Sequence, residues 1–336
     1  MITVENLTKS FRANTGSVLA VDNVTLEVAA GSIAGVVGPA GSGKSTLARL
    51  IGLQERPDSG VIRLDGENTS VLDPRRLRLA RSRIGVVPSG DSLVEQRTTA
   101  GNIAVPLEQA GVDGPLRRTK VGQLLDLIGL TDKAAAYPDA LTRGQRRRVE
   151  VARALVGEPT VLLADDPTGG LDQDGAAGVL TVLDRARAEL GATVVLATAD
   201  PSVVRRIADD VAVLEEGRIV ERGGLLELVA RRDGRLAESI LPAIDPTAAS
   251  AVGHDRVVDV VLIGFAAVGA LLPEAATRFG VDIPVLGGGL TRLGETPVAR
   301  FRVGVTGSRA DTAIAWITDR GGVVHPVSPT VRGVAA

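Results

Sequence analysis

The chain has 336 residues, of which 44% are hydrophobic and 23% charged, and its formal net charge at pH 7 is -2. This composition excludes a disordered or fibrous polymer, and the lack of cysteine excludes disulfides and thiolate metal sites. Aromatic residues make up only 2% and there is no basic excess, so we expect no nucleic-acid partner.

A chain of this length favours two domains, because a single core rarely grows beyond about 250 to 300 residues. The N-terminal segment lacks the basic and then apolar layout of an export signal, so we expect no export. The longest uncharged apolar run, residues 260–272, has 13 residues. A bilayer-spanning helix needs roughly 20 residues, so we expect any membrane role to be carried out at the membrane surface, without a spanning segment.

The first two-thirds of the chain alternate strand and helix patterns. Short β-branched runs broken by Gly and Asn predict strands within residues 2–11 and 21–38, and a helix opens within 43–54. The continuously apolar run at 161–166 is typical of a strand covered by helices on both faces. A further strand is predicted at 193–200, with another after it. This order indicates a doubly wound α/β domain.

Three changes of pattern predict the domain organisation. Between residues 88 and 157 the sequence turns helical and rich in arginine, which indicates an inserted helical subdomain. Small residues and two prolines replace periodicity at 236–255, which indicates a linker after a first domain at 1–235. Residues 256–336 then show the order strand, helix, two strands, helix and strand. That βαββαβ order predicts an α+β, ferredoxin-like domain.

One motif predicts a phosphate site. Residues 38–46, GPAGSGKST, match G-x-x-x-x-G-K-[ST] between an apolar strand and a helix. In such a loop backbone N–H groups surround a phosphate, Lys44 reaches the terminal phosphates and Ser45 holds Mg²⁺. The plain alternative is a glycine turn before a helix, but Lys44 is one of only four lysines. The predicted ATP and Mg²⁺ site comprises Gly38, Pro39, Ala40, Gly41, Ser42, Gly43, Lys44, Ser45 and Thr46.

Two adjacent carboxylates follow a buried strand. Asp165 ends the apolar run 161–165 and is the natural second group for Mg²⁺, with a turn or helix-cap aspartate as the alternative. Asp166 follows at once, where a base that orients the attacking water would lie. We therefore predict Asp165 as a metal ligand and Asp166 as the catalytic group.

Together these segments resemble the ATP-binding subunits of ABC transporters over nearly the whole chain. LTRGQ at 141–145 is similar to the signature segment of that family. The resemblance implies that two subunits, two copies or this chain and a paralogue, enclose two ATP molecules. It also implies that Phe11 stacks on adenine, the alternative being a core phenylalanine at a strand end. The residues implied to contact nucleotide in trans are Leu141, Thr142, Arg143, Gly144 and Gln145.

The methionine-importer branch of that family is the nearer resemblance. AYP at 136–138, GGLD at 169–172 and AIAW at 313–316 are similar to segments of that branch. The tail from residue 257 resembles its ligand-sensing NIL domain, which binds methionine and restrains transport. The resemblance implies a peripheral subunit on the cytoplasmic face of the plasma membrane. It further implies membrane permease subunits docked through residues 88–107 and a small amino acid bound at the C-terminal domain.

Four positions depart from the family pattern, and all four concern hydrolysis. Pro88 and Ser89 lie where the family has the glutamine that connects γ-phosphate and Mg²⁺ to the membrane partner. Arg143 replaces the first glycine of the signature, where it could either bind phosphate as a charged donor or obstruct close approach. Asp166 replaces the catalytic glutamate and is one methylene shorter. Ala199 replaces the histidine that steadies the γ-phosphate, and both histidines of the chain lie outside the predicted ATPase domain.

These departures leave two functions open. Losing a positioned general base costs about 10² to 10⁴ in rate, so we expect turnover at least ~10²-fold below that of an intact relative, unless Asp166 suffices. The first function is an importer subunit that hydrolyses ATP slowly. The second is an ATP-binding protein that regulates or scaffolds without useful turnover. In the tail, residues 282–284 also depart from a polar pattern, and His325 is predicted to be a surface residue rather than a ligand.

Overall fold

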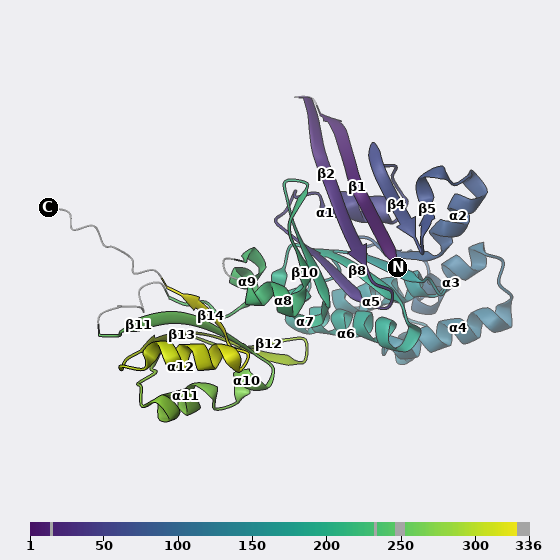
Figure 1. The fold of residues 1–336 in the computed structure, drawn as a ribbon. Coiled ribbons are helices and arrows are strands. Elements are labelled where there is room, and N and C mark those ends of the chain that lie inside the picture. Colours follow the sequence, from purple (N-terminus) through teal and green to yellow (C-terminus); the bar gives the residue numbers. More distant parts are fainter. Residues whose placement is uncertain (14–15, 232–233, 246–252, 328–336) are drawn as a thin grey trace. The chain divides into compact units, whose positions relative to one another are not determined.

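The computed structural model describes residues 1–13, 16–231, 234–245 and 253–327. The chain divides into two compact units, Met1–Gly224 and Leu225–Ala336 (Figure 1). The domain limits expected from the sequence, with a linker at 236–255, stay a prediction. Within the described part of the chain, no helix combines the length and the apolar character needed to cross a bilayer.

The first unit contains two sheets. Its strands are β1 (Ile2–Ala13), β2 (Gly16–Val28), β3 (Ile33–Val37), β4 (Ser59–Leu64), β5 (Glu67–Asn68), β6 (Ile84–Val87), β7 (Val161–Asp165), β8 (Thr193–Thr198), β9 (Asp210–Glu215) and β10 (Arg218–Gly224). Its helices are α1 (Lys44–Ile51), α2 (Pro74–Ser82), α3 (Thr99–Gln109), α4 (Gly114–Leu127), α5 (Arg143–Leu155), α6 (Gln173–Leu190) and α7 (Pro201–Ile207). Short 3₁₀ turns are η1 (Thr69–Val71), η2 (Thr131–Lys133) and η3 (Pro138–Ala140).

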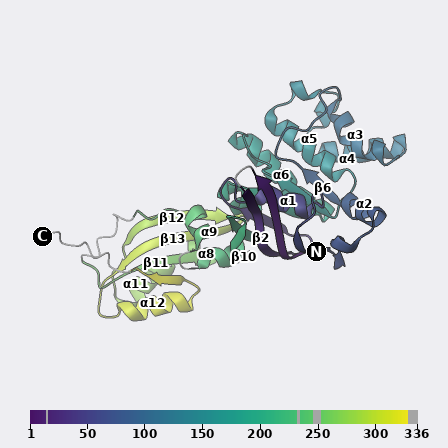
Figure 2. The same ribbon diagram turned by 90° about the horizontal axis from the view of Figure 1, so that it is seen from above.

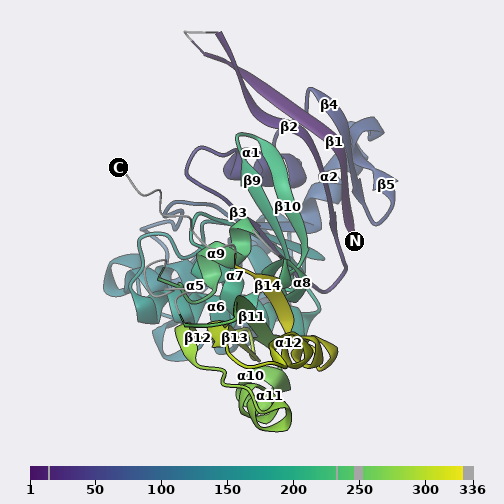
Figure 3. The same cartoon turned by 60° about the vertical axis from the view of Figure 1, so that its left-hand side comes forward.

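The larger sheet has the order β10-β9-β3-β8-β7-β6. All its pairings are parallel except that of β9 with β10. Every residue of β3 is buried, as expected for a strand covered on both faces. The predicted doubly wound α/β fold is therefore confirmed. The second sheet, β2-β1-β4-β5, is antiparallel, and its β1–β2 hairpin extends well beyond β4 (Figure 3).

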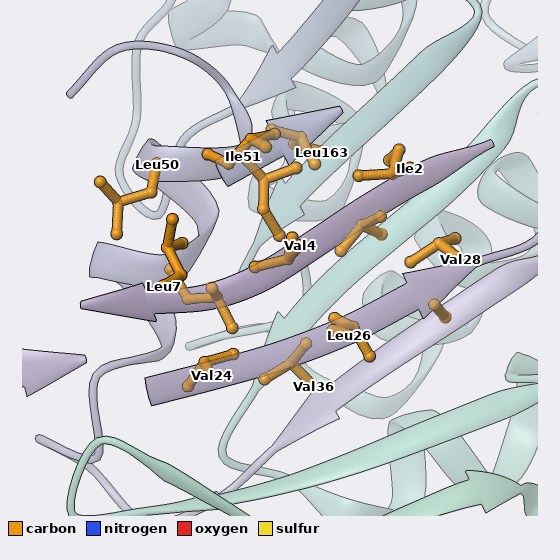
Figure 4. Close-up of a cluster of buried hydrophobic side chains, with 14 of the residues drawn as sticks. Ile2, Val4, Leu7, Val24, Leu26, Val28, Val36, Leu50, Ile51 and Leu163 are labelled. Atoms are coloured by element: carbon orange, nitrogen blue, oxygen red, sulfur yellow. The ribbon is translucent and has the colours of Figure 1, made fainter. Parts of the chain in front are cut away.

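The main core of this unit lies between the antiparallel sheet and the strands and helix that carry the phosphate motif. Figure 4 shows Ile2 and Val4 of β1 facing Leu50 and Ile51 of α1 and Leu163 of β7. All five side chains are essentially inaccessible to solvent. Burying each side chain of this size contributes roughly 1.5 to 3 kcal/mol, so this packing fixes α1 against the sheet.

Three helices, α3, α4 and α5, lie between β6 and β7, in the stretch predicted to be helical. Apolar residues on one face of α5 bury it in the unit, among them Val149, Ala152 and Leu155. A Cβ on Gly144 would lie 2.6 Å from the Cα of Gly175, so glycine permits the close approach of α5 and α6. This contact fixes the start of α5 beside the start of α6.

The second unit begins with two short helices and continues as a four-stranded antiparallel sheet of order β12-β13-β11-β14. Its elements are α8 (Leu225–Ala230), α9 (Arg235–Ile240), β11 (Arg256–Ile263), α10 (Phe265–Val268), α11 (Leu271–Phe279), β12 (Val285–Leu293), β13 (Thr296–Val305), α12 (Ala310–Asp319) and β14 (Val323–Pro326). The predicted ferredoxin-like order is confirmed. The sequence pattern missed α9 and α10, which have only 6 and 4 residues.

Candidate nucleotide site

The phosphate motif forms the loop between β3 and α1. A Cβ on Gly38 would lie 2.0 Å from the carbonyl oxygen of Leu214, and one on Gly43 would lie 2.1 Å from that of Ala20. Gly41 and Gly43 also have positive φ angles of 80° and 103°. Glycine is therefore required by neighbouring backbone as well as by conformation. The loop ends at the N-terminus of α1, where backbone N–H groups have no intrahelical acceptor and suit an anion.

Lys44 closes over this loop. Its ammonium donates to the carbonyl oxygens of Gly38 and Pro39, both at 2.8 Å. Burial lowers the pKa of Lys44, and the charges of Asp165 and Asp166 offset part of that effect. A compact, partly desolvated cation thus lies between the loop and two carboxylates.

Ser45 and Asp165 meet at the ends of α1 and β7. The Ser45 hydroxyl donates to Oδ1 of Asp165 at 3.0 Å, although 120 residues separate them. A hydroxyl and a carboxylate are oxygen donors of the kind that Mg²⁺ accepts, and Mg²⁺ usually takes few protein ligands beside phosphate and water. Among the residues that the structure describes, no cluster of three His, Cys, Asp or Glu could hold a metal. The donor set therefore fits Mg²⁺ bound together with a phosphate.

Asp166 adopts the left-handed region, with φ of 48°, which aspartate tolerates better than most residues. Its N–H donates to the carbonyl oxygen of Ala197 at 2.7 Å. Its Oδ1 lies 3.5 Å from the Thr198 hydroxyl. A Cβ on Gly169 would lie 2.1 Å from Oδ2, so the carboxylate packs directly on a glycine. The contacts with Thr198 and Gly169 are features that the sequence reasoning missed.

Two of the departing positions lie at the carboxyl ends of sheet strands. Ser89 follows β6 and Ala199 follows β8, and both are exposed. The Ala199 methyl group offers no hydrogen-bond donor. The structure thus places both substitutions at the edge where parallel strands of this fold class bind ligands.

The segment 141–145 begins α5. Thr142 is the N-cap: its hydroxyl accepts from the Gln145 N–H at 3.2 Å, and its own N–H donates to the Gln145 amide oxygen at 2.9 Å. This reciprocal capping box was missed, although T-x-x-Q is its sequence signature. Leu141 is buried, whereas Arg143 is exposed, with Nη1 3.5 Å from the carbonyl oxygen of Gly170.

Phe11 lies near the end of β1 and pairs with Val18, near the start of β2. Its side chain is 36% exposed, so it is a surface residue. The Lys9 ammonium lies 5.5 Å from the ring centroid. The stacking role of Phe11 stays a prediction, as do the roles of the other proposed site residues.

A buried acid-centred network joins the segment after β6 to α5. Glu150 is 2% exposed, and its Oε1 accepts from the Ser92 N–H at 2.6 Å and from the Ser92 hydroxyl at 2.7 Å. Its Oε2 pairs with Arg147 at 2.8 Å. Arg147 also donates to the carbonyl oxygens of Pro88 at 2.7 Å and Gly90 at 3.2 Å. These bonds bracket Ser89 on both sides and tie it to the helix that begins with segment 141–145.

Comparison with known proteins places this geometry in a family. A family model described as ABC transporter matches residues 21–169, and one described as NIL domain matches residues 256–325. The chain is 42% identical over 327 residues to a methionine import ATP-binding protein, MetN, of Thermobifida fusca, covering 97% of this chain and 100% of that protein. It is 40% identical to the MetN of Symbiobacterium thermophilum, covering 96% and 97%.

The chain belongs to the ABC transporter family, in the branch that carries a NIL domain. A solved ABC cassette, described as a dimer in a post-hydrolysis state bound to ADP and Pi, is 31% identical. It aligns with a TM-score of 0.61 over 67% of this chain and 99% of its own. The match thus covers about the length of the first unit, and membership of the ABC family supports ATPase activity.

Proposed function

We propose that this chain is the ATP-binding subunit of an importer for methionine or a related amino acid. It would energise a separate membrane permease and hydrolyse ATP slowly. The full-length similarity to two proteins named methionine import ATP-binding proteins supports the solute. The observation that carries the proposal is the 3.0 Å contact of Ser45 with Asp165 beside Lys44, because it brings together the groups that we propose to bind phosphate and Mg²⁺.

ATP would lie with its phosphates in the loop 38–46. Backbone N–H groups at the start of α1 would bind the phosphate oxygens, and the Lys44 ammonium would exchange its carbonyl partners for the terminal phosphates. Ser45 and Asp165 would hold Mg²⁺, which neutralises charge that develops on the phosphates. Phe11 would stack on the adenine ring.

The chemistry of bond cleavage rests on Asp166. A carboxylate one methylene shorter than glutamate, packed on Gly169, reaches less far toward an attacking water. Ala199 supplies no donor for the γ-phosphate, and Ser89 has a shorter side chain than the family's glutamine. We therefore expect ATP turnover at least ~10²-fold below that of a relative that has the family's glutamate, histidine and glutamine at these positions.

The working assembly would contain two ATPase subunits, either two copies or this chain and a paralogue. Residues 141–145 of one subunit would then contact nucleotide held by the other, with Arg143 as a charged donor. Permease subunits would dock on residues 88–107, so the protein would be peripheral, on the cytoplasmic face of the plasma membrane. The proposed domains are an ATPase domain at 1–235, with its helical subdomain at about 88–157, and a regulatory domain at 256–336 after the linker.

The C-terminal domain would bind a small amino acid and restrain transport when that solute is abundant. Its ferredoxin-like fold and its match to the NIL domain support this role. Binding of methionine to the full chain, measured by calorimetry, tests it. No heat at millimolar methionine would count against methionine as the ligand.

A second candidate is a regulatory or scaffold protein that binds ATP without useful turnover. The four departures at Ser89, Arg143, Asp166 and Ala199 favour it. Steady-state phosphate release with Mg²⁺-ATP separates the two candidates. A rate above that of Lys44→Ala supports the importer subunit, whereas an equal rate with saturable nucleotide binding supports the regulator. Absence of saturable binding would contradict both.

A further inference from the structure

The C-terminal sheet has one apolar and one polar face. Ala299, Phe301 and Val303 of β13 belong to the core cluster formed with α11 and α12. The intervening residues, Arg300 and Arg302, therefore lie on the opposite face, because side chains alternate along a strand. In Figures 1 and 2, α8 and α9 lie on that opposite face, away from α11.

A cleft of about 300 Å³ lies between this polar face and the two short helices. Arg300 and Arg302 of β13 and Asp259 of β11 are among the residues that line it on the sheet side. Val229 of α8 and Leu241, at the end of α9, line it on the helix side. Clefts of this size hold small molecules rather than single ions.

Two of the polar groups at the cleft satisfy each other or the backbone. Arg302 donates to both oxygens of Asp259, at 2.7 and 2.9 Å, so this pair is bidentate and neutral. His325 Nε2 lies 3.2 Å from the carbonyl oxygen of Ala230. Because a carbonyl only accepts, His325 donates there and holds the end of α8 to the sheet.

Arg300 is different. It is half-buried in the cleft, and within the described residues its guanidinium has no hydrogen-bond or ion-pair partner. A guanidinium carries five N–H donors, and those of Arg300 are open to solvent, so a ligand in the cleft can reach them. Arg231 and Glu238 are exposed at the same cleft. Among the described residues of the lining, three arginines stand against two carboxylates, an excess of one positive charge.

We propose that this cleft binds a small monocarboxylate with a short apolar body. The carboxylate would accept a bidentate pair of hydrogen bonds from Arg300, which matches its planar geometry. The apolar body would lie against Val229, Val261 and Leu241, all buried residues of the lining. The one excess positive charge among the described lining residues favours a ligand with one negative charge over a ligand with two.

The proposal does not depend on ATP turnover or on methionine, because recognition needs no ammonium group on the ligand. Ligand binding would strengthen the contact between the two short helices and the sheet. A ligand in the cleft would contact both the helices and the sheet, adding to the hydrogen bond between His325 and Ala230. Such a ligand would hold α8, which starts directly after β10, against the sheet.

Hexanoate, with hexanol as its uncharged analogue, is the probe. Methyl NMR of the full chain, labelled at Val and Leu, should show saturable shifts of Val229, Val261 and Leu241 with hexanoate and none with hexanol. Arg300→Gln should raise the hexanoate Kd at least about tenfold, because a charge-assisted bidentate bond is lost. Arg292→Gln, an exposed arginine of β12 outside the lining, is the matched control and should change the Kd less than about twofold.

Glu238→Gln removes an exposed negative charge from the cleft, so its expected effect on the hexanoate Kd is opposite to that of Arg300→Gln. This variant keeps the test informative even if Arg300→Gln folds poorly. Removing this carboxylate should tighten hexanoate binding, about twofold or more at low salt. Equal binding of hexanoate and hexanol would overturn the proposal. So would equal losses from Arg300→Gln and Arg292→Gln, or the lack of any saturable shift at these three methyl-bearing residues.

Discussion

The carboxylate of Asp166 rests on Gly169 so closely that a Cβ at position 169 would lie 2.1 Å from Oδ2. The same carboxylate lies 3.5 Å from the Thr198 hydroxyl, a length at which a hydrogen bond contributes little. The backbone of Asp166 is well fixed by its bond to Ala197, but its side chain is held mainly by packing. If Asp166 has the proposed catalytic role, its reach rather than disorder of the loop would limit that role.

Lengthening this side chain should raise turnover. In Asp166→Glu the extra methylene carries the carboxylate outward from Gly169 toward the water that attacks the γ-phosphate. We expect kcat for phosphate release to rise by about tenfold to 10²-fold, within the range that a positioned base supplies. Asp126→Glu, at an exposed aspartate of α4, makes the same chemical change away from the proposed site residues and should leave kcat unaltered. No gain over the parent rate would show that reach is not the limit.

Two glycines of the phosphate loop should respond differently to alanine. Both Gly41 and Gly43 have positive φ, which costs an alanine roughly 1 kcal/mol. A Cβ on Gly43 would in addition meet the carbonyl oxygen of Ala20 at 2.1 Å, whereas a Cβ on Gly41 meets nothing within 4 Å. Gly43→Ala should therefore lower the free energy of unfolding by about 2 to 4 kcal/mol and abolish saturable ATP binding.

Gly41→Ala is the matched control, since it carries the conformational cost alone. It should lower the free energy of unfolding by about 1 kcal/mol and keep ATP binding within roughly tenfold of the parent. Denaturant unfolding and titration with labelled nucleotide measure both effects. If both substitutions lowered the free energy of unfolding and the affinity for ATP equally, strain in the loop, rather than contact with β2, would explain the glycine at position 43.

Features that form one contiguous motif or a regular hydrophobic pattern can be predicted from the sequence. The loop 38–46 is one uninterrupted motif, and the buried strands are apolar throughout in β3 and up to Asp165 in β7, so both were readable. The Glu150 network was not, because Ser92 lies 58 residues before Glu150 and no local pattern marks a buried acid. Helices α9 and α10 have too few residues to show a period. The capping box at Thr142 was readable from T-x-x-Q but was overlooked beside the signature resemblance.

Removing one partner of the buried Glu150 pair should destabilise the first unit strongly. In Glu150→Gln the charge of Arg147 stays buried without its counter-ion, which costs roughly 3 to 5 kcal/mol. Glu189→Gln breaks the exposed pair with Arg185 and should cost far less stability, because solvent screens this pair. The double variant Arg147→Gln/Glu150→Gln should recover part of the loss, because the buried charge of Arg147 is then removed as well.

Denaturant unfolding of the four proteins measures these energies, and hydrogen exchange at the Ser92 amide gives a local reading. That N–H donates to Glu150 at 2.6 Å, so its exchange should accelerate more in Glu150→Gln than in Glu189→Gln. If the double variant were less stable than Glu150→Gln, the network would owe its stability to the bonds of Arg147 with Pro88 and Gly90 rather than to charge balance.

Asp58 ties down the hairpin that carries Phe11, and this tie should depend on pH. Its carboxylate accepts from the N–H and hydroxyl of Ser10, both at 2.7 Å, and from the Lys9 ammonium at 3.1 Å. The hydrogen bonds from Ser10, followed by that from Lys9, lower the pKa of Asp58 to about 2. A carboxyl in the unfolded chain has a pKa of about 3.9. Since the folded value is the lower one, the stabilisation is complete above about pH 4 and is lost as the pH falls toward 2.

Comparison of the parent with Asp58→Asn isolates this group, because the other carboxylates titrate in both proteins. The parent should unfold at higher denaturant concentration at pH 6, and the difference in midpoint should shrink between pH 4 and pH 2. The exposed Asp139→Asn should show no such pH-dependent difference from the parent. At neutral pH, Asp58→Asn should also weaken ATP binding if Phe11 stacks on adenine. A midpoint difference that stayed constant from pH 6 to pH 2 would mean that Asp58 acts through its shape and not through its charge.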